Sequence, residues 1–389
     1  MDRRIIICST NQLPRGNANS NYIFNMAKSL KEYADEVISI GASNQDHRID
    51  EVIEGVRCIN ISFYKKHIPM IFKGNFSFGL PMINELKKLK ITPNDYIIIY
   101  DGYALQLRQL DSFFKFMPKG HIVTCVVEWP MKNQYSLAPI NPKYIEWLRI
   151  FNKWMPNWGK IIPISRNLEN HFIKAGCETF ILPPMIDSSD YQICESKKVN
   201  EVCDFIYSGV FSQKDAMENM ILSVEKLTDE ERKKFRFHIT GNSMQTLESF
   251  LGDKKYVLKK YSDNIIVHGR LPYDELLELY ANTDYLLLAR PENQYTISNF
   301  PSKVPEMMNY GIVPVCSNVG DYTNLYLTDG EDSIIFDGCS VDDCANAIKR
   351  ALSLTSEQRQ QMKLNAKNNS AKMFDFRVWG EKLAKFIFE

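Results

Sequence analysis

The chain has 389 residues, of which 44% are hydrophobic and 24% are charged. This length is more than one ordinary core needs and suits two domains, and the composition is that of a globular protein. The 47 basic and 47 acidic side chains give a formal net charge of zero, which argues against duplex nucleic acid as the main partner, because proteins that bind it carry a basic excess.

The first predicted element is a strand, because the apolar run Ile5–Cys8 follows two arginines and stops at Ser9. A signal peptide would need a longer apolar stretch and a small-residue cleavage site. No window approaches about 18 consecutive apolar residues, so we expect no transmembrane helix. The 9 cysteines form no C-x-x-C pair, which is typical of reduced thiols. These features predict a cytoplasmic protein.

Strand patterns alternate with helical patterns, such as 21–33 and 273–282, along the whole chain. Many strand candidates are nearly continuous runs of Ile, Val, Leu and Phe, as in parallel strands that are buried on both faces. The alternation predicts a doubly wound α/β fold. The strand candidates are Arg4–Cys8, Glu36–Ile40, Arg57–Ile61, Tyr96–Tyr100, Ile122–Val127, Lys160–Ile164 and Phe180–Leu182, then Phe205–Ser208, Phe235–Thr240, Ile265–His268, Tyr285–Ala289, Ile312–Cys316 and Ser333–Phe336.

The alternation is interrupted between Pro183 and Glu201, where proline, serine and charged residues show no periodicity. Such a composition predicts a linker. We therefore expect two Rossmann-like domains, over 1–186 and 187–370, and a helix in the tail 371–389.

Several common nucleotide and metal motifs are missing. None of the 18 glycines forms a G-x-G pair, and Gly74 and Gly79 have P-loop spacing but are followed by Leu80 and Pro81. There is no G-x-S-x-G or H-E-x-x-H motif, and the 6 histidines show no metal-ligand spacing. These absences leave sugar-nucleotide transferases, their structural relatives and two-lobed sugar-binding receptors.

A short helix is predicted after the strand 285–289. Ser302 is a candidate N-cap, Pro305 falls in the first turn, and Gly311 suits the left-handed position that ends a helix. The free N–H groups at such a helix start form an anion site at the mouth of the sheet.

Charged residues surround this helix start. Lys303 and Arg290 add positive charge there, and Glu306 lies about one turn into the helix. A carboxylate in that place can accept two hydrogen bonds from vicinal hydroxyl groups. The stretch therefore predicts an anion site with a carboxylate beside it that can bind a pair of hydroxyl groups.

The segment FPSKVPEMMNYGIVPV, which contains these residues, resembles the donor-site helix of glycosyltransferase family 4, a large retaining family with the GT-B fold. The segment 205–209 with Lys214 resembles that family's strand, glycine and diphosphate-binding lysine. The segment 266–270 resembles its base-binding strand, and 14–18 resembles its first glycine loop.

The resemblance implies two Rossmann-like doubly wound domains that face a cleft. The acceptor would bind to 1–186 and the nucleotide sugar to 187–370, and the helix in 371–389 would pack back on the first domain. The implied reaction moves a sugar from a nucleotide-diphosphate-sugar to a glycan or lipid-linked acceptor in polysaccharide biosynthesis, with retention of configuration. No metal or other cofactor is implied.

Site residues follow from the same resemblance. The catalytic candidates are Glu128, Lys214 and Arg290, and the donor-binding candidates are Gly16, Gly209, Lys214, His268, Gly269, Arg290, Ser298, Asn299, Phe300, Ser302, Lys303 and Glu306.

The chain departs from the family pattern at three places. Ser298 stands where the first of two glutamates is usual, and Val210 and Phe211 stand where an arginine follows the glycine. Glu128 replaces a frequent histidine. These departures concern how the hydroxyl groups of the donor sugar are bound.

Each candidate also has a structural alternative. Lys214 could be a solvated loop lysine, Arg290 could pair with Glu292, and His121 and His268 could be ordinary structural histidines. The aromatic run 147–158 suits helix packing, with membrane contact as the alternative.

A basic, apolar segment lies between Glu54 and Glu85, which has no acidic residue inside it. Such a segment can lie on anionic lipid, which predicts peripheral contact with the inner face of the membrane, or it can form an acceptor-site loop. Its basic residues are Arg57, Lys65, Lys66, His67 and Lys73.

Rival functions remain at this point. A sugar-nucleotide epimerase of GT-B fold would act without an acceptor, and a two-lobed sugar-binding protein or a degenerate transferase would catalyse nothing. Analysis of the product separates the first rival from a transferase.

Overall fold

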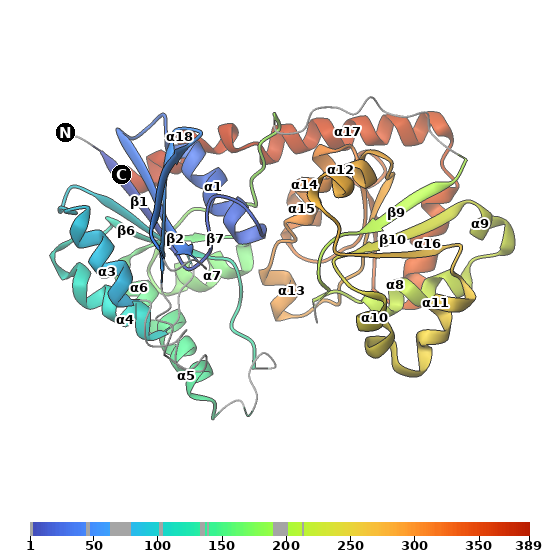
Figure 1. Ribbon diagram of the computed structural model, residues 1–389, viewed down its shortest axis with the longest axis horizontal. Coiled ribbons are helices and arrows are strands. Elements are labelled where there is room, and N and C mark those ends of the chain that lie inside the picture. Colours follow the sequence, from blue (N-terminus) through green and yellow to red (C-terminus); the bar gives the residue numbers. More distant parts are fainter. Residues whose placement is uncertain are drawn as a thin grey trace. The chain divides into compact units, whose positions relative to one another are not determined.

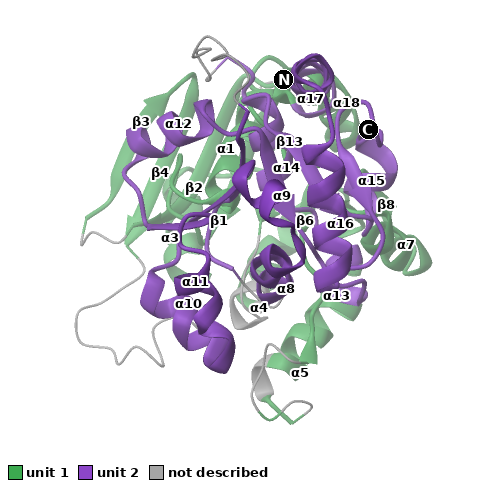
Figure 2. Ribbon diagram, turned by 90° about the vertical axis from the view of Figure 1, so that its right-hand side faces the viewer, with its two compact units in different colours: residues 1–186, 375–389 green, residues 187–374 purple. Residues whose placement is uncertain are grey.

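The computed structural model describes residues 3–43, 47–62, 79–100, 104–132, 137, 140–189, 201–211 and 214–389. The chain forms two compact units (Figures 1 and 2). Unit 1 comprises 1–186 and 375–389, and unit 2 comprises 187–374. No helix in the described ranges is long and apolar enough to cross a membrane.

Unit 1 is built on an eight-stranded sheet with the order β3-β4-β2-β1-β5-β6-β7-β8. Only the β3–β4 pair is antiparallel among the pairs described. Ile5, Ile6 and Ile7 of the central strand are fully buried, which explains the continuous apolar run. The strands are β1 (Arg4–Ser9), β2 (Glu36–Ser43), β3 (Ile49–Ile53), β4 (Val56–Ser62), β5 (Tyr96–Tyr100), β6 (Ile122–Val126), β7 (Lys160–Pro163) and β8 (Glu178–Thr179).

Two expectations about these strands need correction. The strand expected at 180–182 is β8, which ends at Thr179. Edge strand β3 has no counterpart among the expected strands, because its central residues are exposed and give no apolar run. It pairs back on β4 through a turn at Glu54 and Gly55.

The helices of unit 1 include the aromatic run 147–158, in which Phe151 and Trp158 pack inward, as the helix-packing interpretation predicts. Phe151 is buried, with its ring centroid 5.0 Å from that of Phe172. Trp158 is buried and donates to Asp111 Oδ1 at 2.9 Å. The helices are α1 (Ala18–Leu30), α3 (Gly79–Lys88), α4 (Ala104–Phe113), α5 (Pro142–Arg149), a π-helical turn (Ile150–Trp154), α6 (Met155–Trp158), α7 (Arg166–Lys174) and α18 (Phe376–Phe388).

Unit 2 is built on a six-stranded, wholly parallel sheet with the order β11-β10-β9-β12-β13-β14. Its strands are β9 (Cys203–Tyr207), β10 (Phe235–Thr240), β11 (Ile265–Gly269), β12 (Tyr285–Leu288), β13 (Val313–Ser317) and β14 (Ile334–Phe336). With the sheet of unit 1, this confirms the doubly wound α/β class that the strand patterns predict.

Helices cover both faces of the unit 2 sheet, with α12, α14 and α17 on one side and α8, α10 and α16 on the other (Figure 1). The helices are α8 (Met217–Leu222), α9 (Asp229–Lys233), α10 (Met244–Leu251), α11 (Tyr256–Lys260), α12 (Tyr273–Ala281), α13 (Gln294–Ser298), α14 (Lys303–Asn309), α15 (Asp321–Tyr326), α16 (Val341–Leu352) and α17 (Ser356–Phe374).

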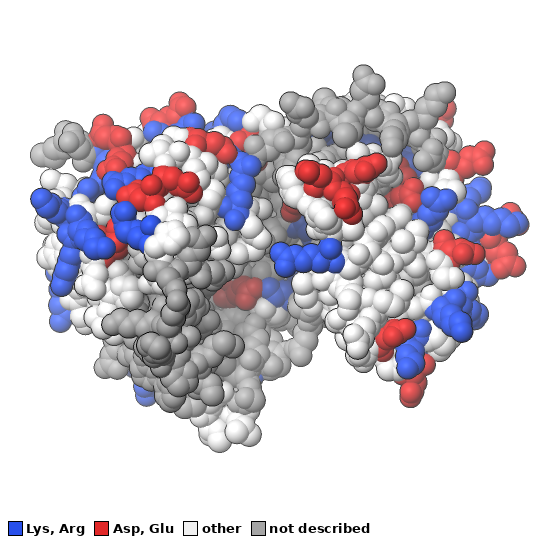
Figure 3. Space-filling model, in the orientation of Figure 1, with Lys and Arg blue, Asp and Glu red and all other residues white. Residues whose placement is uncertain are grey.

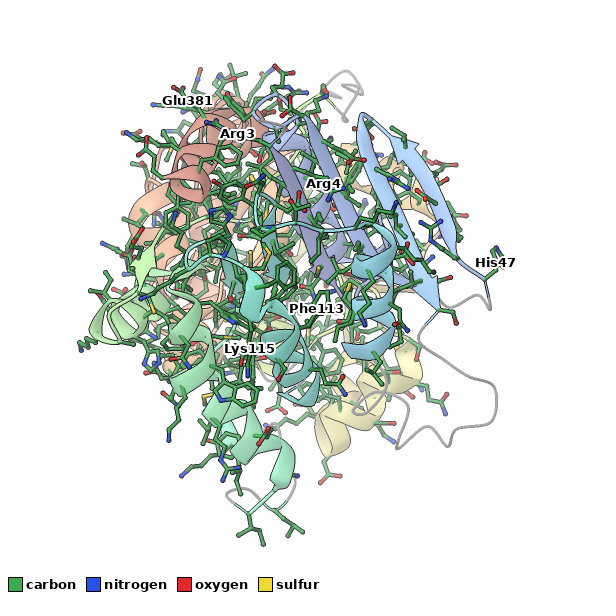
Figure 4. All side chains as sticks on the ribbon, turned by 90° about the vertical axis from the view of Figure 1, so that its left-hand side faces the viewer. Arg3, Arg4, His47, Phe113, Lys115 and Glu381 are labelled. Carbon is green, nitrogen blue, oxygen red and sulfur yellow. The ribbon has the colours of Figure 1, made fainter. Side chains whose placement is uncertain are left out.

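The C-terminal helix α18 belongs to unit 1. Helix α17 continues to Phe374, so the returning segment begins at Asp375 and not at residue 371. Asp375 caps α18 by accepting from Arg377 N at 2.9 Å. The Arg3 guanidinium lies 4.8 Å from the Phe388 ring centroid, which places the end of α18 beside the start of β1 (Figure 4).

Charged side chains of both signs are interspersed over both units on the face shown in Figure 3. The described part of that face has no broad basic patch of the kind that duplex nucleic acid requires.

Candidate functional site

All strands of unit 2 point the same way, so their carboxyl ends meet at one edge of the sheet. Ligands of open α/β sheets bind outside this edge. Gly209 follows β9, Gly241 follows β10, Gly269 ends β11, and Arg290 comes shortly after β12. The fold therefore brings together candidates that are far apart in sequence.

A buried carboxylate organises the charges at this edge. Asp215 follows Lys214 and has a side chain that is 6% exposed. It accepts from Arg290 Nε at 2.9 Å and from the Tyr207 hydroxyl, and Lys303 Nζ lies 3.5 Å from its second oxygen. Burial by itself would raise the pKa of Asp215, but Lys303 and Arg290 outweigh burial and lower it to about 2. The carboxylate is therefore ionised at neutral pH.

Arg290 is held on several sides and is only 3% exposed. Besides its bond to Asp215, Nη2 donates to Asn299 Oδ1 at 3.2 Å and the backbone N–H donates to Ser317 Oγ at 2.7 Å. Its ionic partner is thus Asp215 and not Glu292. Arg290 Nη1 has no acceptor among the described residues, so one donor group of the guanidinium is left over.

The first turn of α14 presents two half-buried groups of opposite charge. Lys303 Nζ lies 3.6 Å from the Tyr207 ring centroid, and burial, partly opposed by Asp215, lowers the pKa of Lys303 to about 8. Burial raises the pKa of Glu306 to about 7, although the Lys303 charge opposes this. The Glu306 carboxylate makes no hydrogen bond with another described residue, so both of its oxygens can accept from a ligand.

The ends of α14 match the expected positions only in part. Gly311 adopts the left-handed conformation, with φ +73°, and its N–H donates to Met308 O at 2.8 Å, as predicted for a helix end. Ser302 occupies the N-cap position, but its side chain makes no capping hydrogen bond. The Ser302 backbone is helical, whereas a capping residue is normally extended, so the expectation of a serine cap is wrong.

A short helix, α13, precedes α14 and was not among the expected elements. Asn293 Oδ1 accepts from the backbone N–H groups of Tyr295 and Thr296, and Thr296 Oγ1 accepts from Asn293 N. This reciprocal pair is a capping box. The Asn-x-x-Thr spacing is the sequence signal that could have revealed it.

Residues 298–300 are buried in unit 2. Ser298 is fully buried and donates to Gln294 O of its own helix at 2.6 Å, and Asn299 holds Arg290. Phe300 is 4% exposed, so its side chain serves packing within unit 2. The rings of Tyr322, Tyr326 and Phe374 have centroids 6.0, 5.5 and 5.8 Å from that of Phe300.

Glycines lie at the carboxyl ends of β9, β10 and β11 in unit 2. Gly209, Gly241 and Gly269 all have positive φ. A Cβ added to Gly241 would lie 2.6 Å from the backbone carbon of Gly209, and Gly241 N donates to Gly269 O at 2.7 Å. Sequence reasoning found Gly209 and Gly269 but missed Gly241, which lies between their strands.

The remaining candidates are dispersed. Lys214 is half-buried, with Nζ 4.7 Å from the Tyr295 ring centroid. His268 is half-buried and its Nε2 lies 2.9 Å from His238 Nδ1. Gly16, with φ +140°, and the half-buried Glu128 belong to unit 1. The described residues hold no group of His, Cys, Asp or Glu arranged to bind a metal.

Comparison with known proteins gives a consistent picture. Residues 193–369 match the family described as glycosyl transferases group 1. Sucrose-phosphate synthase from Thermosynechococcus elongatus has a similar structure, with a TM-score of 0.74 at 13% identity over 98% of each chain. No curated protein matches the sequence.

Two other solved structures are also similar. HepE from Anabaena, solved with UDP and glucose, gives a TM-score of 0.68 at 14% identity over 98% of each chain. WaaG, a glycosyltransferase involved in lipopolysaccharide biosynthesis, gives 0.68 at 16% identity over 99% of each chain. At such identities the likeness establishes the fold, which is GT-B.

Proposed function

We propose how this chain binds its nucleotide sugar and which acceptor it uses, from one premise. Residues 193–369 belong to the group 1 glycosyl transferases, so the chain is a glycosyltransferase that uses a nucleotide sugar. We propose that the donor binds at the carboxyl edge of the unit 2 sheet, and that transfer proceeds with retention to a glycan or lipid-linked acceptor. The observation that carries the donor site is the half-buried pair Lys303 and Glu306 beside ionised Asp215.

The chemistry of transfer needs negative charge to be stabilised on the departing nucleoside diphosphate. Lys303 and Lys214 are exposed enough to contact its oxygens. Arg290 is 3% exposed, so its part is to hold Asp215 and Asn299, with Nη1 left for an oxygen that reaches it. Glu306 accepts from the two ribose hydroxyl groups when it is ionised.

Unit 1 is proposed to serve the sugar and the acceptor. Gly16 lies in the β1–α1 loop without a side chain, and Glu128 follows β6 at a strand end. Both positions are of the kind that α/β domains use for ligands. Glu128 is our candidate for contact with the donor sugar or the attacking hydroxyl.

The nucleotide sugar is identified by a thermal unfolding screen of the purified chain. UDP-glucose is the first candidate, since HepE was solved with it. A ligand at 100 times its dissociation constant adds roughly 2.7 kcal/mol of stability. Failure of every UDP-, GDP-, ADP-, CDP- and dTDP-sugar to raise the unfolding temperature would contradict the donor site.

Product analysis by NMR separates the rivals. A retaining transferase releases nucleoside diphosphate only with acceptor present and keeps the anomeric configuration. An epimerase changes the nucleotide sugar without an acceptor, and a sugar-binding protein is stabilised but forms no product.

Peripheral membrane contact is a further part of the proposal. The basic residues of the segment between Glu54 and Glu85 fall largely in 63–78, outside the described residues, and Arg57 pairs with Asp50 at 2.9 Å. In unit 1, Leu137 and Ile140 are 79% and 72% exposed, which supports an apolar contact. Co-sedimentation with vesicles containing anionic lipid tests this; equal recovery with neutral vesicles would exclude the electrostatic part.

A further inference from the structure

The loop between β1 and α1 of unit 1 has a buried stem and an exposed tip. Residues 11–13 form the stem, in which Leu13 is 3% exposed, and the backbone N–H of Ala42 in β2 donates to Asn11 O at 2.9 Å. Residues 15–18 form the tip and are all exposed. The tip is therefore the part of the loop that a ligand can reach.

A side-chain amide from a distant strand holds the stem. Asn60 of β4 accepts from Leu13 N through Oδ1 at 2.9 Å and donates to Leu13 O through Nδ2 at 2.8 Å. The amide thus pairs with the backbone of Leu13 as a neighbouring strand would. Two bonds to one residue fix both its place and its orientation.

The position of Asn60 within β4 is one where an apolar residue would be expected. Its neighbours Ile59 and Ile61 are buried, and Asn60 itself is only 2% exposed. Burying an amide costs free energy unless its polar groups are bonded, and here both the oxygen and the nitrogen are. An apolar side chain would avoid that cost, so what the amide contributes is a defined place for the loop.

The neighbouring strand β2 leaves room for this arrangement. Gly41 lies opposite Asn60 in the register of β2 and β4. A Cβ at Gly41 would overlap Asn11 O and would lie 2.8 Å from Leu13 Cγ. The stem therefore lies directly against the backbone of β2, where any side chain would displace it.

The loop is also fixed at its far end. Asn17 caps α1, since its Oδ1 accepts from Ser20 N at 2.9 Å. Only residues 14–16 lie between this cap and Leu13. A shift of Leu13 must therefore be taken up within these three residues, and Gly16 is one of them.

We propose that Asn60 is a positioning residue for sugar transfer, which sets the place of Gly16 by holding Leu13. Asn60 is buried and acts through the loop, so it does not itself touch the ligand. Displacement of a binding group by about 1 Å can cost on the order of 100-fold in rate, so a rigid loop matters to the reaction. The inference rests on the proposed function, in which unit 1 serves the donor sugar.

Asn60→Leu tests this role, because leucine has a similar branched shape but makes neither bond. Calorimetry compares UDP-glucose with UDP, or the corresponding pair found in the thermal screen. We expect the affinity for the nucleotide sugar relative to the diphosphate to fall about tenfold, the size of one lost hydrogen bond. The affinity for the diphosphate alone should stay unchanged, since unit 2 binds it.

Asp95→Asn is the matched control for a loss of stability. Asp95 is also buried in unit 1, at 3% exposed, and accepts from Arg4 Nε at 2.9 Å. It precedes β5, which is parallel to β1, so it lies at the sheet edge opposite the loop. Asp95→Asn should destabilise the protein and leave the affinity ratio unchanged.

Asn60→Asp adds a readout that a role in packing alone would not move. A carboxylate can accept from Leu13 N but cannot donate to Leu13 O, whereas a protonated carboxyl group can do both. Relative to the original protein at the same pH, the affinity ratio of Asn60→Asp should be close to normal at pH 6. It should fall as the pH rises to 9 and the introduced carboxyl group ionises.

The outcomes separate this inference from the function beneath it. If Asn60→Leu binds UDP and keeps the original ratio, the inference is overturned and the donor site stands. An equal fall of the ratio in Asp95→Asn also overturns it. If Asn60→Leu does not fold, Asn60→Asp decides, and a ratio that does not change with pH overturns the inference. If the original protein binds no nucleoside diphosphate, the donor site itself is wrong and the role of Asn60 falls with it.

Discussion

At the scale of single residues, Asp215 decides how positive charge is arranged at the sheet edge. Its carboxylate neutralises the guanidinium of buried Arg290 and holds the ammonium group of Lys303. The side chains of Asp215 and Arg290 are 6% and 3% exposed, respectively. Sequence motifs identify Lys303 and Glu306 but not this pairing, because Tyr207, Asp215, Arg290 and Lys303 converge from separate segments. The spacing of the residues along the chain gives no sign of that convergence.

Loss of the Asp215 carboxylate should therefore destabilise unit 2. We expect Asp215→Ala to lower the free energy of unfolding by about 3 kcal/mol or more at pH 7, because two cations are left without their partner. The pKa of Asp215 is lowered from 3.8 to about 2, so this stabilisation is present above pH 3.8 and disappears as the pH falls through 2. Urea unfolding measures this stabilisation. Arg236→Ala, which removes a more exposed ion pair with Asp204, is the control. A loss below about 1 kcal/mol, as for a surface ion pair, would contradict the role.

Glu306 should make donor binding depend on pH. Its pKa is raised from 4.5 to about 7, so the ionised form that accepts the ribose hydroxyl groups is lost as the pH falls through 7. Protonated Lys303 is lost as the pH rises through about 8, so affinity for the nucleotide sugar should peak between these values. Glu306→Gln should weaken binding about tenfold and remove only the acid limb.

The raised pKa of Glu306 has the opposite effect on the stability of the ligand-free protein, which falls, rather than improves, as the pH rises. A carboxyl group whose folded pKa exceeds its unfolded pKa contributes stability below pH 4.5 and loses it as the pH rises through 7. Glu306→Gln should remove this loss. Ser298→Ala, which gives up a bond to its own helix, is the matched control for binding and should leave the pH profile unchanged. An unchanged acid limb in Glu306→Gln would exclude Glu306 from the ribose site.

At the scale of elements, the strands of unit 2 were largely predictable, because a strand buried on both faces leaves a continuous apolar run. Helix α13 was missed because it has five residues and carries polar side chains, so no periodicity develops. Edge strand β3 was missed for a related reason, since its exposed centre resembles a loop. The contact between strand ends at Gly209 and Gly241 is likewise invisible in the sequence, because it depends on the order of the strands.

That contact makes Gly241 sensitive to any side chain. Gly241→Ala should cost about 1–3 kcal/mol beyond the strain of a left-handed alanine, because its Cβ would lie 2.6 Å from the backbone of Gly209. Gly176→Ala is the matched control, since Gly176 also has φ +81° but no neighbour within 4 Å of the added Cβ. Chemical unfolding compares the two. Equal losses would show that the strand ends are not in close contact.

At the scale of the whole molecule, the chain passes into unit 2 after Ile186 and returns to unit 1 at Asp375. The two crossings are joined by a bond from Phe376 N to Ile186 O at 3.0 Å. Helix α18 then packs on α1, and Lys160 Nζ donates to Phe386 O at 2.9 Å near its end. Unit 1 is therefore completed by residues that the chain reaches only after unit 2.

Gly380 allows α18 to pack closely on α1, because a Cβ at this position would overlap the carbonyl oxygen of Ser29. Gly380→Ala should lower the stability of unit 1 by about 1–3 kcal/mol, even though alanine favours a helix by about 1 kcal/mol over glycine. Glu381→Ala, at the exposed neighbouring position, is the control (Figure 4). If Gly380→Ala stabilised the protein, helix propensity would outweigh packing and α18 would not be closely docked.

The central claim is that the carboxyl edge of unit 2 binds the diphosphate of a nucleotide sugar. The most direct test is a calorimetric titration at pH 7.5, between the pKa values of Glu306 and Lys303, with the nucleoside diphosphate found in the screen, for the original protein and for Lys303→Ala and Lys214→Ala. Each substitution should weaken binding by about 1.5–3 kcal/mol, as expected for a lost charge-assisted hydrogen bond, with the fold intact. Unchanged affinity in both variants would place the diphosphate elsewhere and contradict the account.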